Sequence, residues 1–151
     1  MKEILALALA YAVGAVPFGY LLVRVFSGRD VRAAGSGNIG ATNVLRTAGR
    51  AAGLATLLLD IAKGYAAVWL AGWLTRDAVL WVSAAAVCVM LGHAFPVFLR
   101  FKGGKAVASC IGAFLRLAPL PLAAVLLVFV ATVAATRYIS LGSILAAGSL
   151  P

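Results

Sequence analysis

A polar stretch between strongly apolar flanks, residues 34–46, is the first candidate for chemistry, and it reads AGSGNIGATNVLR. Gly35, Gly37 and Gly40 permit a positive φ, which lets successive backbone N–H groups converge on one point. Hydroxyl, amide and guanidinium side chains add further donors. These side chains belong to Ser36, Asn38, Thr42, Asn43 and Arg46. The donor set suits a phosphate or another compact oxyanion, although such a composition is also common in plain loops.

A second polar patch, residues 100–105, places two glycines between two lysines, directly before an apolar run. Gly103, Gly104 and Lys105 favour an anion cradle, because a helix beginning at Ala106 would direct its N-terminal dipole at the bound charge. The alternative is an ordinary basic loop beside the membrane. A third polar island follows at residues 137–143.

Three ionisable side chains lie within otherwise apolar sequence. Asp60 and Lys63 are three positions apart and therefore share a helix face, and His93 is the one histidine of the chain. Such groups are costly at membrane depth and usually face a protein interior or a wet cavity. We interpret them as support for the polar loop, the alternatives being substrate contact and, for His93, a general base.

The sequence shows no evident Ser-His-Asp set and no His/Cys/Glu metal cluster, so we expect no metal and no cofactor. Cys88 and Cys110 stand in apolar surroundings and are interpreted as buried thiols. Catalysis would then depend on positioning, worth about 7–11 kcal/mol, and on stabilisation of developing charge.

Long apolar helices must position these islands. The chain is 64% hydrophobic and 11% charged, whereas soluble domains have about 45–50% and 25%. The apolar runs predict an all-α polytopic transmembrane helix bundle. Expected helices cover residues 4–26 (kinked at Pro17), 52–74, 78–99 and 122–136, with a short run at 106–118 and a last helix that begins near Leu141 and runs to 151. A cleaved signal peptide fits the first run less well, because its apolar core spans only about 7–15 residues.

The net charge of +9 is distributed unevenly. Of the 13 Lys and Arg residues, nine flank or occupy the three polar islands, while Lys2, Arg76 and Arg116 belong to the opposite side and Lys63 is intramembrane. The positive-inside rule then places the N-terminus outside and all three islands inside, where they converge on one site. Since the basic excess belongs to membrane-flanking loops, we expect no nucleic-acid partner.

Four motifs together resemble the bacterial acyl-phosphate:glycerol-3-phosphate acyltransferase family. They are GSGNIGATNVLR (35–46), DIAKG (60–64), GHAFPVFLRFKGGK (92–105) and RYISLGS (137–143). The resemblance covers essentially the whole chain. It implies a seven-helix fold, of which this chain contains about five to six helices, in a multi-pass enzyme of the cell inner membrane with its active site at the cytoplasmic face. The implied reaction transfers a fatty acyl group from acyl phosphate to the 1-hydroxyl of sn-glycerol 3-phosphate, giving lysophosphatidate and phosphate, the first acylation of phospholipid biosynthesis.

The resemblance also implies roles for individual residues. Ser36, Lys105 and Ser143 would be catalytic. Substrate phosphate would be bound by Gly35, Ser36, Gly37, Asn38, Thr42, Asn43, Arg46, Gly103, Gly104, Lys105, Arg137 and Ser143. Asp60, Lys63 and His93 would lie behind these residues and hold the substrate-binding loop in position. The acceptor's own phosphate would take the hydroxyl proton, which agrees with the lack of an obvious base. We expect glycerol 3-phosphate, acyl phosphate and membrane lipid as partners, and a monomer.

We interpret residues 1–151 as a single integral-membrane acyltransferase domain that is truncated at its C-terminus, because a further polar motif of the family would follow Pro151. An alternative function is a small transporter or channel for a phosphate-bearing anion. Short helices and the intramembrane Asp60 and Lys63 would also serve that role.

Overall fold

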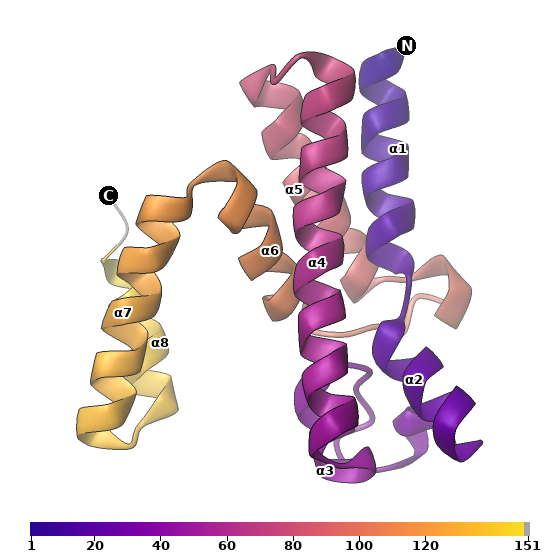
Figure 1. Cartoon of the computed structure of the whole chain (residues 1–151), viewed down its shortest axis with the longest axis vertical. Helices are drawn as coiled ribbons and strands as arrows, with labels where there is room; N and C mark the ends of the chain where they lie inside the picture. Colours follow the sequence, from indigo (N-terminus) through magenta and orange to yellow (C-terminus); the bar gives the residue numbers. More distant parts are fainter. Residues whose placement is uncertain (150–151) are drawn as a thin grey trace. The chain divides into compact units, whose positions relative to one another are not determined.

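Helices of membrane-spanning length dominate the fold. The computed structural model describes residues 1–149, and every regular element within them is helical (Figure 1). Four segments are long and apolar enough to cross a membrane: Lys2–Ser27, Arg50–Thr75, Val79–Leu99 and Pro119–Thr136. The predicted all-α membrane bundle is confirmed. The end of the predicted last helix, residues 150–151, lies outside the described residues.

The chain forms two compact units, Met1–Leu117 and Ala118–Pro151, which are described separately. The first apolar segment consists of α1 (Lys2–Ala15) and α2 (Phe18–Ser27). The two helices are separated at Pro17, as predicted, because proline has no N–H to continue the helical ladder.

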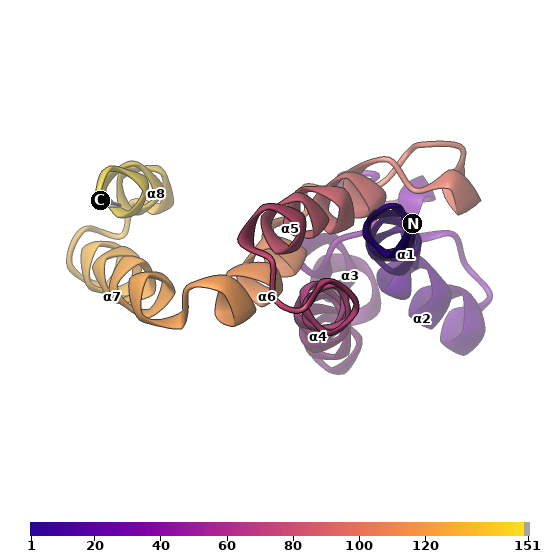
Figure 2. The same ribbon diagram turned by 90° about the horizontal axis from the view of Figure 1, so that it is seen from above.

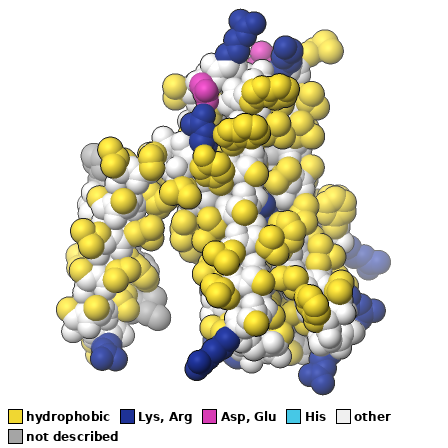
Figure 3. Space-filling view, viewed as in Figure 1, with side chains coloured by type: hydrophobic (Ala, Val, Ile, Leu, Met, Phe, Trp, Pro, Cys, Tyr) yellow, Lys and Arg dark blue, Asp and Glu magenta, His cyan; other side chains and the backbone are white. Residues whose placement is uncertain are grey.

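Helix α4 (Arg50–Thr75) is the centre of the first unit (Figure 2). It packs against α1, α3 (Ala41–Ala48), α5 (Val79–Ala94) and α6 (Val107–Leu117). α5 (Val79–Ala94) packs against both α1 and α4. Small residues allow these close approaches: a Cβ on Gly112 of α6 would collide with the Ile61 carbonyl of α4. The visible face of this unit is largely apolar over its middle (Figure 3).

Several boundaries differ from the sequence prediction. The polar stretch after α2 is only partly loop, since it contains the short helices η1 (Val31–Ala33) and α3 (Ala41–Ala48). α5 ends before Pro96, and η2 (Val97–Leu99) follows it. α6 (Val107–Leu117) is as short as predicted.

In the second unit, α7 (Pro119–Thr136) and α8 (Ile139–Gly148) form an antiparallel pair (Figure 1). α7 begins three residues before the predicted start, because Pro119 and Pro121 occupy its first turn, where a missing N–H costs no hydrogen bond. α8 likewise begins slightly before the predicted Leu141.

Candidate functional site

Two of the three predicted islands meet around one pocket of about 600 Å³ in the first unit. The first island and α3 supply most of its polar wall, the second island supplies Lys105, and apolar side chains of α4 and α6 complete it. The polar lining residues are Ser36, Asn38, Thr42, Asn43, Arg46, Asp60, His93 and Lys105. The apolar wall includes Leu57, Val107, Ala108 and Ile111. Residues more than 60 positions apart in sequence therefore share one site.

Asn43 organises the loop that forms this wall. Its side-chain Nδ2 donates to the carbonyls of Val31, Ala34 and Asn38 at 3.1, 3.1 and 2.8 Å. Its Oδ1 accepts a hydrogen bond from the Ser36 N–H at 2.9 Å. The side chain is buried, and its donors are all engaged within the loop. The structure thus indicates that Asn43 shapes the loop, whereas the sequence suggested that it contacts substrate.

The glycines of this loop differ in what they do. Gly35 and Gly37 have φ of +62° and +70°, which L-residues rarely adopt. A Cβ on Gly35 would also collide with Asn43 Oδ1. Gly40 does not use a positive φ: it has φ −75° at the start of α3, and its N–H donates to Asn38 Oδ1 at 2.8 Å.

Four exposed polar side chains around the pocket are available to a ligand. Ser36, Thr42, Arg46 and Lys105 are solvent-exposed. None of them has a side-chain hydrogen bond or ion pair to another residue within 1–149. Two free cations beside hydroxyl groups can bind a doubly charged phosphate, with Arg46 able to donate two parallel hydrogen bonds.

Gly103 and Gly104 do not form the predicted backbone cradle. Their N–H groups donate to the carbonyls of Ala94 and His93 at 3.2 and 3.0 Å, which fixes this segment against the end of α5. A Cβ on Gly104 would collide with the His93 ring. Their role in this structure is close packing that places Lys105 at the pocket. On this side, the groups that could donate to an anion are the Lys105 ammonium and the first-turn N–H groups of α6.

A buried polar cluster lies behind the pocket. Lys63 Nζ is 2.8 Å from Asp60 Oδ1 and donates to the Val16 carbonyl at 2.8 Å, at the break between α1 and α2. His93 Nδ1 is 3.6 Å from the same Asp60 oxygen and 3.4 Å from Ser109 Oγ of α6. Asp60 Oδ1 has no aligned hydrogen bond, so its contacts are electrostatic.

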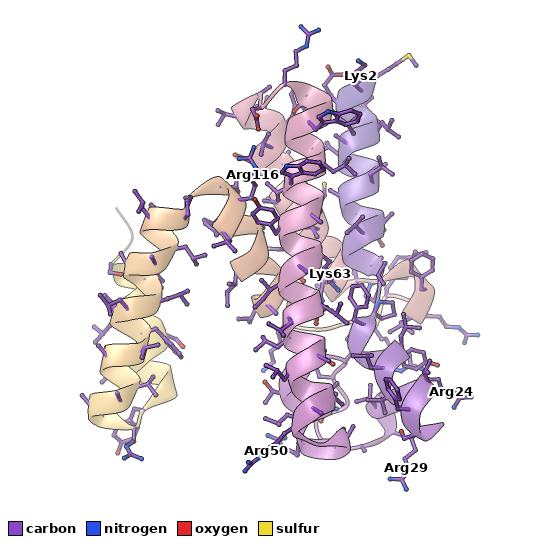
Figure 4. All side chains as sticks on the ribbon, in the orientation of Figure 1. Lys2, Arg24, Arg29, Arg50, Lys63 and Arg116 are labelled. Carbon is purple, nitrogen blue, oxygen red and sulfur yellow. The ribbon has the colours of Figure 1, made fainter. Side chains whose placement is uncertain are left out.

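This cluster joins α4, α5, α6 and the α1–α2 break. The supporting role of Asp60, Lys63 and His93 stays a prediction. Asp60 and His93 also reach the pocket wall, whereas Lys63 does not (its position on α4 is labelled in Figure 4). Sequence reasoning missed Ser109, which is fully buried; a lone serine within the apolar run 106–118 was the available signal.

Arg137 and Ser143 belong to the second unit. Arg137 ends α7 with φ +63°, and Ser143 lies within α8. Their assignment to the site stays a prediction.

The chain is similar in sequence to a known protein family. The family described as Glycerol-3-phosphate acyltransferase matches residues 4–151. A protein of that name from Geobacter sulfurreducens is 52% identical over 151 residues, covering 100% of this chain and 77% of the relative. Another from Desulforamulus reducens is 51% identical over 142 residues, covering 94% and 70%.

Two solved structures have the same fold. Both are crystal structures of PlsY (YgiH), described as an integral membrane glycerol 3-phosphate acyltransferase. The glycerol 3-phosphate form matches with a TM-score of 0.86 and 34% identity, over 97% of this chain and 72% of that one. The lysophosphatidic acid form matches with a TM-score of 0.85 and 31% identity, over 99% and 74%.

Proposed function

The chain belongs to the glycerol-3-phosphate acyltransferase family, and we propose that it acylates the 1-hydroxyl of sn-glycerol 3-phosphate with acyl phosphate as the donor. The products would be lysophosphatidate and inorganic phosphate. One observation carries the proposal beyond the family: a pocket with two unpaired cations, Arg46 and Lys105, continues into an apolar wall between α4 and α6. Both substrates carry phosphate, and one of them carries an acyl chain.

Binding would begin with the phosphates. Arg46 and Lys105 supply the charge, and the hydroxyls of Ser36 and Thr42 supply neutral donors. Because the Ser36 backbone is held by Asn43, this donor is already oriented before substrate enters. Such preorganisation lowers the cost of ordering the site on binding.

The acyl chain would lie against the apolar wall formed by Leu57, Val107 and Ile111. These side chains belong to α4 and α6, which pack directly against each other. An acyl chain held there would place its carbonyl near the polar end of the pocket. The membrane itself would supply the lipid substrate.

In the transfer step, the 1-hydroxyl oxygen attacks the acyl carbonyl, a new ester C–O bond forms, and the C–O bond to phosphate breaks. The electron pair of that bond leaves with inorganic phosphate, whose charge Arg46, Lys105 and Ser36 stabilise. The hydroxyl proton passes to the phosphate of glycerol 3-phosphate. His93 is buried against Asp60 and Ser109, so we assign it a supporting role rather than that of the base.

We also propose the orientation: a monomer in the cytoplasmic membrane, with its N-terminus outside and the pocket at the cytoplasmic face. The charges of the first unit support this, because Lys2 and Arg116 lie toward one end and Arg24, Arg29 and Arg50 toward the other (Figure 4). The positive-inside rule assigns the end with more cations to the cytoplasm.

The transporter alternative is not favoured, since the matched relatives are named as acyltransferases.

The test is acyl transfer by the purified protein reconstituted in bilayer discs. With acyl phosphate and labelled glycerol 3-phosphate, we expect lysophosphatidate and inorganic phosphate in equal amounts, and no product when acyl-CoA or glycerol replaces the corresponding substrate. Product formation from acyl-CoA at the same rate as from acyl phosphate would reject acyl phosphate as the specific donor. Movement of labelled phosphate across a vesicle membrane without ester formation would reject the acyltransferase function.

A further inference from the structure

The first unit contains a second pocket, of about 1060 Å³, that shares no lining residue with the candidate site. Its walls are the end of α2, the first turns of α4, the segment around η1, and the end of α3. We refer to it as the α2–α4 pocket. The apolar part of its lining consists mainly of Leu22, Val23, Phe26, Ala51, Ala52 and Ala55. Its volume matches the upper end of the ~300–1,000 Å³ typical of ligand pockets.

The charge at this pocket is positive. Its lining includes Arg29, which has no hydrogen bond or ion pair to another described residue, and Asp30. Asp30 is neutralised by Arg32, whose Nε and second terminal nitrogen lie 3.0 and 2.7 Å from its two carboxylate oxygens. These hydrogen bonds lower the pKa of Asp30, so the pair stays intact at neutral pH. Arg32 is also 5.0 Å from the Tyr20 ring, which leaves Arg29 as the cation free for a ligand.

The pocket lies where two membrane-spanning segments meet the polar loop. The segment Lys2–Ser27 ends at it, and the segment Arg50–Thr75 begins at it. This is the depth at which lipid acyl chains meet headgroups. Arg24, Arg29 and Arg50 lie at this same end of the unit (Figure 4), and Phe26 is 81% exposed. An apolar cavity rimmed by arginine at this depth complements an amphiphile with an anionic head.

We propose that the α2–α4 pocket binds one anionic diacyl phospholipid of the surrounding membrane. An acyl chain would pack against the α2 and α4 side chains, while the lipid phosphate would pair with Arg29. A site of this kind holds a specific lipid because the chain and the headgroup are recognised together.

The lipid would also act on the neighbouring candidate site, because the two pockets share a wall. Asn43 and Arg46 of α3 face the candidate site, whereas Thr47 and Ala48 at its end line the α2–α4 pocket. Ala34 lines the α2–α4 pocket as well, and its carbonyl accepts a hydrogen bond from Asn43. A lipid that packs against these residues would hold the Ser36 loop in its folded form.

The binding itself does not depend on the acyltransferase reaction, so it can be tested without an activity measurement. The reconstituted protein is exposed to a photoactivatable phosphatidylglycerol, and the labelled peptides are mapped by mass spectrometry. We expect labelling concentrated in peptides that contain residues 22–27 or 51–55, and at least fivefold less labelling by the matching phosphatidylcholine probe.

Two variants locate the contacts. Arg29→Gln should reduce phosphatidylglycerol labelling about fivefold, the usual effect of one cation at a charged surface. Ala55→Leu, which fills the cavity, should reduce labelling by both probes. Lys2→Gln removes one exposed cation from the opposite end of the unit and should leave the labelling unchanged. Unfolded protein is identified separately by a melting curve for each variant.

Three results would overturn the proposal: equal labelling by the two probes, no change with Arg29→Gln, or labelled peptides spread over all lipid-facing helices. Displacement of the probe by lysophosphatidate at lower concentration than by phosphatidylglycerol would overturn the assignment of a diacyl lipid. In a supporting result, acyltransferase activity also rises at least twofold when phosphatidylglycerol replaces phosphatidylcholine, and this rise is lost in Arg29→Gln.

Discussion

The backbone N–H of Ser36 donates a hydrogen bond of 2.9 Å to the side-chain Oδ1 of Asn43, seven residues later in the chain. The side-chain Nδ2 of Asn43 in turn donates to the carbonyls of Val31, Ala34 and Asn38. One buried side chain therefore replaces the backbone ladder that a helix or sheet would provide. The polar loop keeps a fixed shape although it contains two glycines with positive φ.

Replacing Asn43 by alanine should therefore collapse the loop rather than remove a ligand contact. Each buried carbonyl or N–H left without a partner costs about 1–3 kcal/mol, so we expect destabilisation of about 2–4 kcal/mol and a loss of kcat/KM of tenfold or more. Thermal unfolding in detergent and steady-state kinetics measure the two effects. Thr42→Ala, next to it but exposed, is the control for stability and should leave the melting temperature unchanged.

Arg46 should hold a substrate phosphate. Removing a charge-assisted hydrogen bond costs about 1.5–3 kcal/mol, so Arg46→Ala should raise the KM for glycerol 3-phosphate or acyl phosphate by about 10-fold or more. Arg50→Ala is the matched control, because Arg50 is also exposed, four residues later, but does not line the pocket. Equal effects of the two variants would mean that Arg46 acts only through general surface charge.

Lys105 should stabilise charge from the opposite wall of the pocket. Lys105→Ala should lower kcat/KM by about tenfold or more, and Lys105→Arg should restore part of the loss because the positive charge is kept. Lys102→Ala changes an exposed lysine of the same island that does not line the pocket, and it should retain activity within about twofold. If Lys102→Ala were inactive and Lys105→Ala active, the charge-stabilising role would belong to Lys102 instead of Lys105.

The contributions of Asp60 and Lys63 to the stability of the protein should depend on each other. Each is about 98% buried at its side chain, and their charged atoms are 2.8 Å apart. Breaking a buried pair from one side costs about 3–5 kcal/mol, because the remaining charge is left uncompensated. We expect Asp60→Leu and Lys63→Met each to lower the melting temperature strongly, and the double variant to be more stable than the sum of the two losses predicts.

A double-mutant cycle of melting curves in detergent measures this coupling. Additive losses would show that the two side chains act independently, Lys63 through its hydrogen bond to the Val16 carbonyl alone. The pair Asp77→Ala and Arg116→Ala provides a comparison, since these residues form a more exposed ion pair with a contact of 2.6 Å. Exposed pairs contribute only about 0–1 kcal/mol.

The sequence alone determined the membrane-spanning helices and the order of the polar islands, because apolar length and proline geometry act locally. The break at Pro17 and the short α6 follow from nearby residues. The pocket residues Ser36, Arg46 and Lys105 were also found from composition and motif resemblance. The missing Cβ permits a positive φ at Gly35 and Gly37 but does not impose one, since Gly40 of the same loop has φ −75°.

Only the tertiary structure decided which polar groups are free and which are used inside the protein. Asn43 and Arg46 look equally suited to phosphate in the sequence, yet packing turns the amide onto three loop carbonyls and leaves the guanidinium unpaired. The N–H groups of Gly103 and Gly104 bond to α5, and Ser109 meets His93 across two helices. The Ser109–His93 contact joins α5 and α6, so it exists only after these two helices have packed. The Asn43 and glycine hydrogen bonds depend on how the loops fold back on themselves, which residue type alone does not specify.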